Sequence, residues 1–173
     1  MTYINEIQPE EYNEYYGYHI KKNNEDVDLL EALTKGLSST ISFFESLPDD
    51  KLLYRYAEGK WTPKEVLLHL IDTERIFIYR ALRFSRNDKT SLMGFEQDDF
   101  MVNNTANERT IPSLLEEYKA TRVSSIAVFQ NMNVTSSSLI GTASGSPMSA
   151  RAAGFIICGH EIHHIEIIKE KCL

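Results

Sequence analysis

Residues 60–75 read KWTPKEVLLHLIDTER, and they contain the clearest helix start in the 173-residue chain. Thr62 stands where an N-cap belongs, Pro63 follows at the first helical position, and Glu65 comes third. A hydroxyl at the cap and a carboxylate three residues later bond to each other's backbone amides, which is the pattern of a capping box. The stretch therefore predicts a long helix that begins at Thr62 and runs to about Ser85.

Three more helices are predicted from apolar residues that recur at steps of three and four positions, the spacing of one helix face. The expected ranges are about 26–46, 110–133 and 147–171. Asn24 is the expected cap of the first of these helices, and Pro48 ends it. The alternation typical of strands is weak along the whole chain, which favours an all-α fold.

The remaining segments connect these helices. Residues 1–23 are rich in tyrosine and lack a period, so we expect a strap that packs on the bundle through its aromatic side chains. Residues 87–109 form a polar connector, and connectors of this length can cross a bundle from one end to the other. Residues 135–147 are rich in Ser, Thr and Gly and predict a loop. The expected architecture is one domain over residues 1–173, an up-and-down four-helix bundle with an N-terminal strap and a long connector between its second and third helices.

The composition is that of an ordinary globular chain, with 42% hydrophobic and 25% charged residues. The net charge of −7 argues against nucleic-acid partners, because binding phosphates requires a cationic surface. No apolar run is long enough to cross a bilayer, so we expect a cytoplasmic protein without a membrane partner. Cys158 and Cys172, about 21 Å apart if both lie on the last helix, are expected to be free thiols.

Histidines are concentrated near the end of the chain, where residues 159–164 read GHEIHH. His160 and His164 are four positions apart and therefore lie one above the other on one helix face. Two imidazoles in this arrangement can bind one metal ion at about 2.0 Å each. His69, inside the helix predicted from residues 60–75, is the candidate for a third ligand from a facing helix.

Two other metal motifs fit this sequence less well. His160, Glu161 and His164 match the zinc protease motif, but only nine residues follow His164 and none of them is a histidine that completes the site. A di-iron carboxylate bundle requires a second Glu-x-x-His besides Glu161 and His164, and the sequence has no second copy. Three histidines leave a coordination position open, as in reactive sites, and imidazoles suit Zn, Ni, Cu or Fe.

The stretches just quoted, together with YRALRF at 79–84 and FEQDD at 95–99, resemble the DinB/YfiT-like superfamily of metal-binding four-helix proteins. The resemblance spans most of the chain. It implies that His69, His160 and His164 bind one divalent metal ion, Zn or Ni, and that the protein forms a homodimer. Relatives include thiol-dependent S-transferases and isomerases, and others are described as metal-dependent hydrolases.

The function implied by this resemblance is that of a metal-dependent enzyme, and the first expectation is an S-transferase. A low-molecular-weight thiol would bind the metal as thiolate and attack an electrophilic substrate, both of them small molecules. The alternatives are a metal-dependent hydrolase and a non-catalytic metal-bound binding or sensor module. Turnover without added thiol distinguishes the hydrolase from the transferase.

Several side chains near the expected ligands are candidates for further roles. Glu161 is the candidate catalytic residue, as a proton-transfer group, and the alternative is a carboxylate outside the reacting centre. Asp72, one turn after the histidine of the second helix, is a candidate to orient that imidazole, and the alternative is an acid on the helix surface. Asp98 and Asp99 are candidates to border the mouth of a pocket, and the alternative is a solvated loop. His19, in the strap, is expected to be a surface or packing residue.

Overall fold

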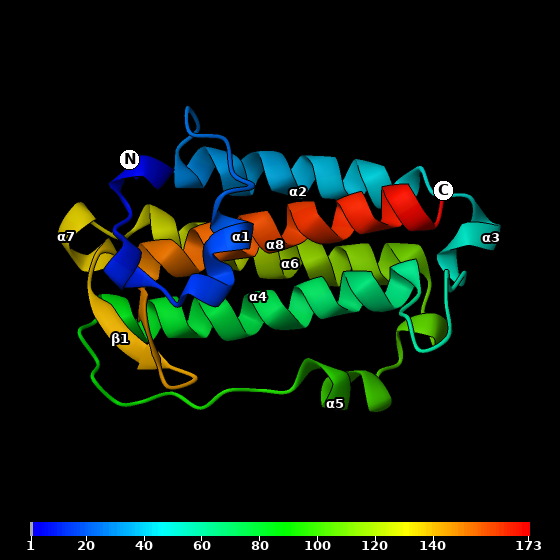
Figure 1. Ribbon diagram of the computed structural model, residues 1–173. Coiled ribbons are helices and arrows are strands. Elements are labelled where there is room, and N and C mark those ends of the chain that lie inside the picture. The colour runs from blue at the N-terminus through cyan, green and yellow to red at the C-terminus, as the bar shows by residue number, and fades with distance from the viewer. Residues whose placement is uncertain (1) are drawn as a thin grey trace.

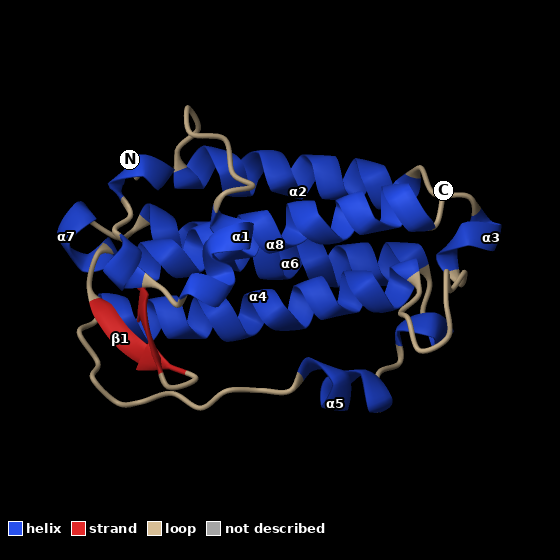
Figure 2. Cartoon of the chain, viewed as in Figure 1, coloured by secondary structure: helices blue, strands red, loops and turns tan. Residues whose placement is uncertain are grey.

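The computed structural model describes residues 2–173 and, over that range, contains four long helices that lie side by side (Figure 1). They are α2 (Leu29–Glu45), α4 (Pro63–Ser85), α6 (Ile111–Gln130) and α8 (Ala150–Lys171). Helices α2 and α4 each pack against both α6 and α8, so α2 and α4 occupy opposite corners of the bundle. The all-α four-helix bundle expected from the sequence is confirmed (Figure 2).

The chain does not reverse its direction at every step. In Figure 1, α4 and α6 both run from the end of the bundle near the C-terminus towards the opposite end, and the connector carries the chain back along the outside. The strict up-and-down order is therefore replaced by a crossing connection between α4 and α6, which the length of the connector permits. The connector contains the short helix α5 (Gln97–Val102) and a 3₁₀ turn, η4 (Ala106–Glu108).

The N-terminal strap lies on the last helix. Its one-turn helix α1 (Gly17–Ile20) packs against α8. The other short helices and 3₁₀ turns are η1 (Ile4–Glu6), η2 (Pro9–Glu11), η3 (Glu14–Tyr16), α3 (Asp49–Leu52) and α7 (Val134–Ser137). Within residues 2–173, no helix is both long enough and apolar enough to traverse a lipid bilayer.

The long helices begin at residues whose side chains accept hydrogen bonds from the first turn. At α4 the capping box is confirmed, because Oγ1 of Thr62 accepts from the backbone N of Glu65 at 3.2 Å and Oε2 of Glu65 accepts from the backbone N of Thr62 at 2.8 Å. At α2 the cap is Asp28, whose Oδ1 accepts from two backbone amides. The expected cap, Asn24, instead closes a turn ahead of the helix, so α2 begins later than predicted.

A two-stranded antiparallel hairpin begins in the segment predicted as a loop, residues 135–147, and ends at Ser149, so the last helix begins slightly later than predicted. It consists of β1 (Ile140–Ala143) and β2 (Ser146–Ser149). The turn residues Ser144 and Gly145 have φ values of 53° and 74°, and two positive φ angles are typical of the type I′ turn that joins twisted strands. Strands of four residues are too short to show a clear alternation, which is why the sequence pattern missed them. The backbone of Leu92 in the connector is hydrogen-bonded to this hairpin.

The hydrophobic core forms two clusters with a polar layer between them. One cluster includes Phe77, Phe84 and Phe155, and the other includes Phe44 and Leu67. Along α4, α6 and α8, the residues between the clusters include Thr73, Glu74, Arg122, Ser125, His160, Glu161 and His164, with His69 beside them. The candidate site lies in this polar layer.

Both cysteines are free, as the sequence predicted, and both are buried. Cys158 belongs to the first hydrophobic cluster. Burial raises the pKa of its thiol to about 12, so Cys158 stays protonated and acts as a small packing residue.

Candidate metal centre

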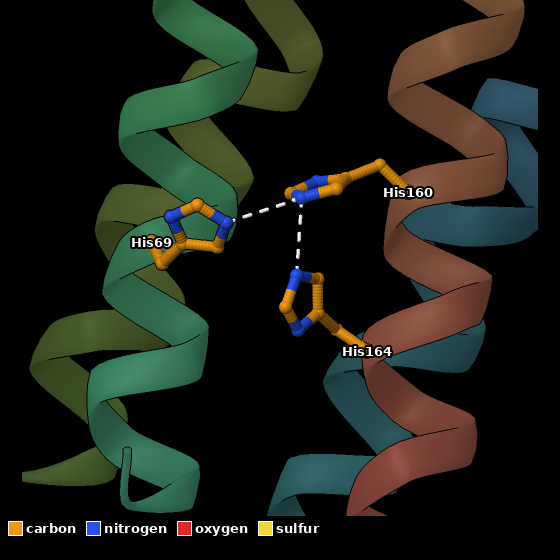
Figure 3. A group of neighbouring side chains, drawn as sticks. All are labelled: His69, His160 and His164. Atoms are coloured by element: carbon orange, nitrogen blue, oxygen red, sulfur yellow. Dashed lines mark hydrogen bonds between the residues drawn. The ribbon is translucent and has the colours of Figure 1, made fainter. Parts of the chain in front are cut away.

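Three imidazoles meet between α4 and α8 (Figure 3). His69 lies two turns into α4, and His160 and His164 lie one turn apart on α8, so the packing of these two helices brings them together. Nε2 of His160 is 3.1 Å from Nε2 of His69 and 3.0 Å from Nε2 of His164. The structure thus brings together the three residues that the sequence predicted as ligands.

The spacing of the three ring nitrogens suits shared binding of a metal ion better than hydrogen bonds between the rings. Tetrahedral nitrogen ligands at about 2.0–2.1 Å from zinc lie roughly 3.3 Å apart, close to the two Nε2 separations. All three candidate ligand atoms lie within 4.8 Å of one another. A neutral imidazole has one donor and one acceptor nitrogen, so Nε2 of His160 makes a good hydrogen bond with only one neighbour. A cation at the common point is a partner that three lone pairs can share.

Burial keeps these imidazoles neutral. Burial lowers the pKa of His69 to about 4. Burial, together with the neighbouring imidazoles, lowers the pKa values of His160 and His164 well below the ordinary value for histidine. All three rings are therefore unprotonated at neutral pH, which is the form that binds a metal ion.

Thr73 and Trp61 restrict the imidazole of His69. Oγ1 of Thr73 lies 3.5 Å from Nδ1 of His69, the ring nitrogen turned away from the other two histidines. The ring centroid of Trp61 lies 4.7 Å from that of His69 and 6.3 Å from that of His164. Asp72, the candidate to orient His69, instead forms an ion pair with an arginine one turn further along α4, in agreement with the alternative of an acid on the helix surface. The contact with Nδ1 comes from the next residue, Thr73.

A cavity of about 370 Å³ lies beside the three histidines, with walls from the strap, α4, the connector and α8. It is lined by four aromatic rings and two carboxylates, from Tyr15, Tyr16, Phe77, Phe95, Glu96 and Asp98. Of the two connector acids predicted at a pocket mouth, Asp98 lines this cavity, whereas Asp99 is exposed and lies outside the lining. The described lining residues include no lysine or arginine.

His19 also lines this cavity, which the sequence did not predict. Its ring makes edge contacts with the rings of His160 and His163, at centroid distances of 5.3 and 5.4 Å. The backbone carbonyl oxygen of His19 lies so close to Gly159 that a Cβ added to this glycine would be 1.8 Å away. A glycine directly before His160 is the one signal in the sequence that another segment approaches the helix here.

One buried arginine supports the rim of the cavity. Arg80 is 2% exposed, and its Nη2 donates to the carbonyl of Met93 in the connector and to Oγ of Ser144 in the hairpin turn. Its guanidinium carbon lies 5.0 Å from the ring centroid of Phe77, and the side chain also interacts with the hydroxyl of Tyr16 in the strap. Strap, connector and hairpin therefore meet at a single side chain.

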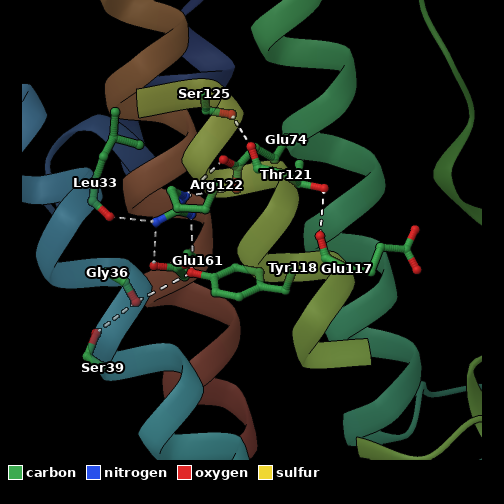
Figure 4. A network of polar contacts seen from close by, with 10 residues as sticks. All are labelled: Leu33, Gly36, Ser39, Glu74, Glu117, Tyr118, Thr121, Arg122, Ser125 and Glu161. Atoms are coloured by element: carbon green, nitrogen blue, oxygen red, sulfur yellow. Dashed lines mark hydrogen bonds and ion pairs between the residues drawn. The ribbon is translucent and has the colours of Figure 1, made fainter. Parts of the chain in front are cut away.

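Glu161, the candidate proton-transfer group, lies on a different side of α8 from His160, because consecutive residues are separated by about 100° around a helix. It is buried against α6, where its Oε2 accepts from Nη2 of Arg122 at 2.7 Å and from the hydroxyl of Tyr118 at 2.5 Å (Figure 4). Glu161 is not among the lining residues of the large cavity. This placement is that of a carboxylate outside the reacting centre.

The architecture is shared with known proteins. The sequence profile of the DinB superfamily matches residues 32–168. Among solved structures, YfiT from Bacillus subtilis is similar, with a TM-score of 0.74 and 15% sequence identity over 86% of this chain and 90% of that chain. It is described as a probable metal-dependent hydrolase with an unusual four-helix bundle topology. At this identity, the likeness to YfiT establishes the fold alone. No curated protein matches the chain.

Proposed function

Because this chain belongs to the DinB superfamily, we propose that it is a metal-dependent enzyme in which His69, His160 and His164 bind one divalent ion. The observation that carries the proposal is the convergence of three neutral imidazoles at one point, beside a cavity. A set of three nitrogen ligands is typical of reactive rather than structural sites, and it suits zinc or nickel.

The ion supplies Lewis acidity, which favours the deprotonated form of a nucleophile such as water or a thiol. The protein's own side chains bind and orient. Trp61 and Thr73 restrict His69, and the four aromatic rings of the cavity offer apolar surface to a small molecule. Glu96 and Asp98 favour substrates that are neutral or positively charged.

Hydrolysis of a small molecule is the reaction that we propose first, and it is the class named in the description of YfiT. The charges of the cavity support it. With two carboxylates in the lining and no lysine or arginine among its described residues, a thiol cosubstrate that carries carboxylates finds no cationic partner. Water as the nucleophile requires no such partner.

Thiol-dependent S-transfer, expected from the resemblance, is the second candidate. The ligand set favours it, because three neutral imidazoles would hold a bound ion without offsetting its charge, which would then favour an anionic sulfur. The charges of the cavity then point to a neutral or amine-bearing thiol. The thiol, the electrophilic substrate and the homodimer stay predictions.

Metal analysis of protein purified without a histidine tag tests the ligand assignment. We expect one zinc or nickel ion per chain in the wild type and a large loss in His160→Ala. Equal metal contents in the two proteins would refute the three-histidine site.

The reaction class is tested with a panel of small esters, amides and alkylating electrophiles, with and without added thiols. Metal-dependent turnover without thiol supports hydrolysis, and turnover that requires a thiol supports transfer. Metal binding with no turnover in either arm would favour a binding or sensor module.

A further inference from the structure

Arg122 binds two carboxylates in the centre of the bundle, within the polar layer that also holds the histidines (Figure 4). Its Nε donates to Oε1 and Oε2 of Glu74 at 2.9 and 3.0 Å, and its Nη2 donates to Oε2 of Glu161 at 2.7 Å. All three residues are buried, with an exposed fraction of 1% for Arg122, 2% for Glu74 and 3% for Glu161. The cluster joins three helices, since its members lie on α4, α6 and α8.

The cluster contains more negative than positive charge. Two carboxyl groups share one guanidinium, and in the described part of the chain neither Glu74 nor Glu161 forms an ion pair with any other cation. The hydroxyl of Tyr118 donates to Glu161 without adding charge, because burial raises the pKa of Tyr118 far above its ordinary value. The acidic side chains of the cluster therefore outnumber its one guanidinium, which gives a formal charge of −1.

Stability alone does not account for this cluster. A buried ion pair seldom stabilises a fold more than well-packed hydrophobic side chains do, because desolvation offsets the attraction. An excess charge adds to that cost, and Gly36 shows how tightly α2 closes over it. A Cβ at Gly36 would lie 2.5 Å from Oε1 of Glu161 and 2.7 Å from Nη1 of Arg122. A formal negative charge buried in this way is explained if a positive charge binds nearby.

The cluster and the metal centre border one small cavity. Its volume is about 10 Å³, close to the least space that holds a single water molecule. Glu74, Arg122 and Glu161 line it, and so do Thr73 and His160. Since Nε2 of His160 faces the other two imidazoles, its Nδ1 lies on the edge of the ring turned away from them.

We propose that Glu74 and Glu161 are positioning residues of the metal centre, held by Arg122 and acting through His160 across this small cavity. The inference rests on the metal site proposed above. The second ring nitrogen of a metal-binding histidine is generally supported by a carboxylate, a carbonyl or a water, which fixes the ring and makes it a better ligand. The net negative charge also stabilises a divalent cation, because the surrounding interior has a low dielectric constant.

Glu74→Gln tests this inference, because it keeps the shape of the side chain and removes the excess charge. Zinc affinity is measured by competition with a chelator of known affinity. The signal is the fluorescence of Trp61, the single tryptophan, whose ring lies 4.7 Å from that of His69. We expect zinc binding to weaken roughly 10- to 100-fold. Glu117→Gln is the matched control, since Glu117 pairs with surface arginines of α4 and of the connector, and its variant should bind zinc like the wild type.

The absorption spectrum of the cobalt(II)-loaded protein is the second readout, because its d–d bands report ligand geometry, which a loss of stability alone does not change. We expect the bands to shift in Glu74→Gln and to stay in place in Glu117→Gln. If the wild type binds zinc and Glu74→Gln matches it in affinity and spectrum, the positioning role is refuted while the metal site stands. If the wild type binds no metal, the proposed function itself fails.

Tyr118→Phe replaces Glu74→Gln if that variant does not fold. It removes one hydrogen bond to Glu161 and keeps every charge of the cluster. The expected loss of zinc affinity is smaller, roughly 2- to 10-fold, the equivalent of one hydrogen bond. Unchanged affinity in a folded Tyr118→Phe protein would then overturn the inference.

Discussion

The buried imidazole of His69 makes the stability of the metal-free protein depend on pH. The pKa of His69 is about 4 in the folded protein and 6.5 in an ordinary histidine. At a pH between these two values, the unfolded chain therefore binds one proton more than the folded protein. The stability that neutral His69 contributes is present above pH 6.5 and is lost as the pH falls towards 4. We expect this residue to lower the free energy of unfolding by about 3 kcal/mol across that window.

Urea unfolding in EDTA between pH 7.5 and pH 4.5 measures this effect. His69→Gln is the comparison, because a side chain that does not titrate should make the stability fall less steeply with decreasing pH. Parallel curves for the variant and the wild type would show that another group is responsible.

At Gly159 the strap and α8 are too close for any side chain, since an added Cβ would lie 1.8 Å from the carbonyl oxygen of His19. We expect Gly159→Ala to cost about 1–3 kcal/mol, as overpacking does, and to displace His19 from the cavity wall. Gly17→Ala in the same strap is the control, because its Cβ would meet Tyr12 at an ordinary distance of 3.7 Å. Thermal unfolding compares the two, and an equal effect in both would contradict the close approach.

At the scale of the element, the position of His69 depends on α4 beginning at Thr62. Thr62→Ala leaves the backbone amide of Glu65 without its acceptor, and we expect a loss of about 1–2 kcal/mol in the free energy of unfolding. Thr34→Ala removes an exposed hydroxyl that bonds back to a carbonyl of α2, and it should change stability little. Urea unfolding of both variants tests the cap, and similar losses would argue against its importance.

The helices and the three ligands were predictable because local patterns encode them. These patterns are a capping box, apolar residues that recur every three or four positions, and two histidines four positions apart. The start of α2 was not predictable from the sequence, since Asn24 and Asp28 are both suitable caps and only the turn at Asn24 decides between them. The partner of Glu161 was not predictable from the sequence either. Arg122 is 39 positions away, and the pairing follows from which helices are neighbours, which sequence spacing does not reveal.

At the scale of the whole molecule, the net charge of −7 and the carboxylates at the cavity favour the approach of cations. Among substrates with the same reactive group, we expect kcat/KM to be several-fold higher for a cationic than for an anionic member, and the ratio to fall with added salt. The double variant Glu96→Gln, Asp98→Asn should reduce the ratio of kcat/KM between the cationic and the anionic substrate. Glu45→Gln, an exposed acid of α2 outside the cavity lining, is the control. An anionic substrate that reacts as fast as its cationic counterpart would contradict the expectation.

Arg80 gives three distant parts of the chain a shared anchor. The strap, the connector and the hairpin turn all contact its guanidinium. If one of these segments moves away from Arg80, the contacts of the other two with Arg80 are weakened. We therefore expect the strap, the connector and the hairpin turn to open together in one equilibrium, and not as three segments that move independently. Slowly exchanging amides in these segments would share a common opening free energy. A small molecule would then find the histidines either covered or fully accessible.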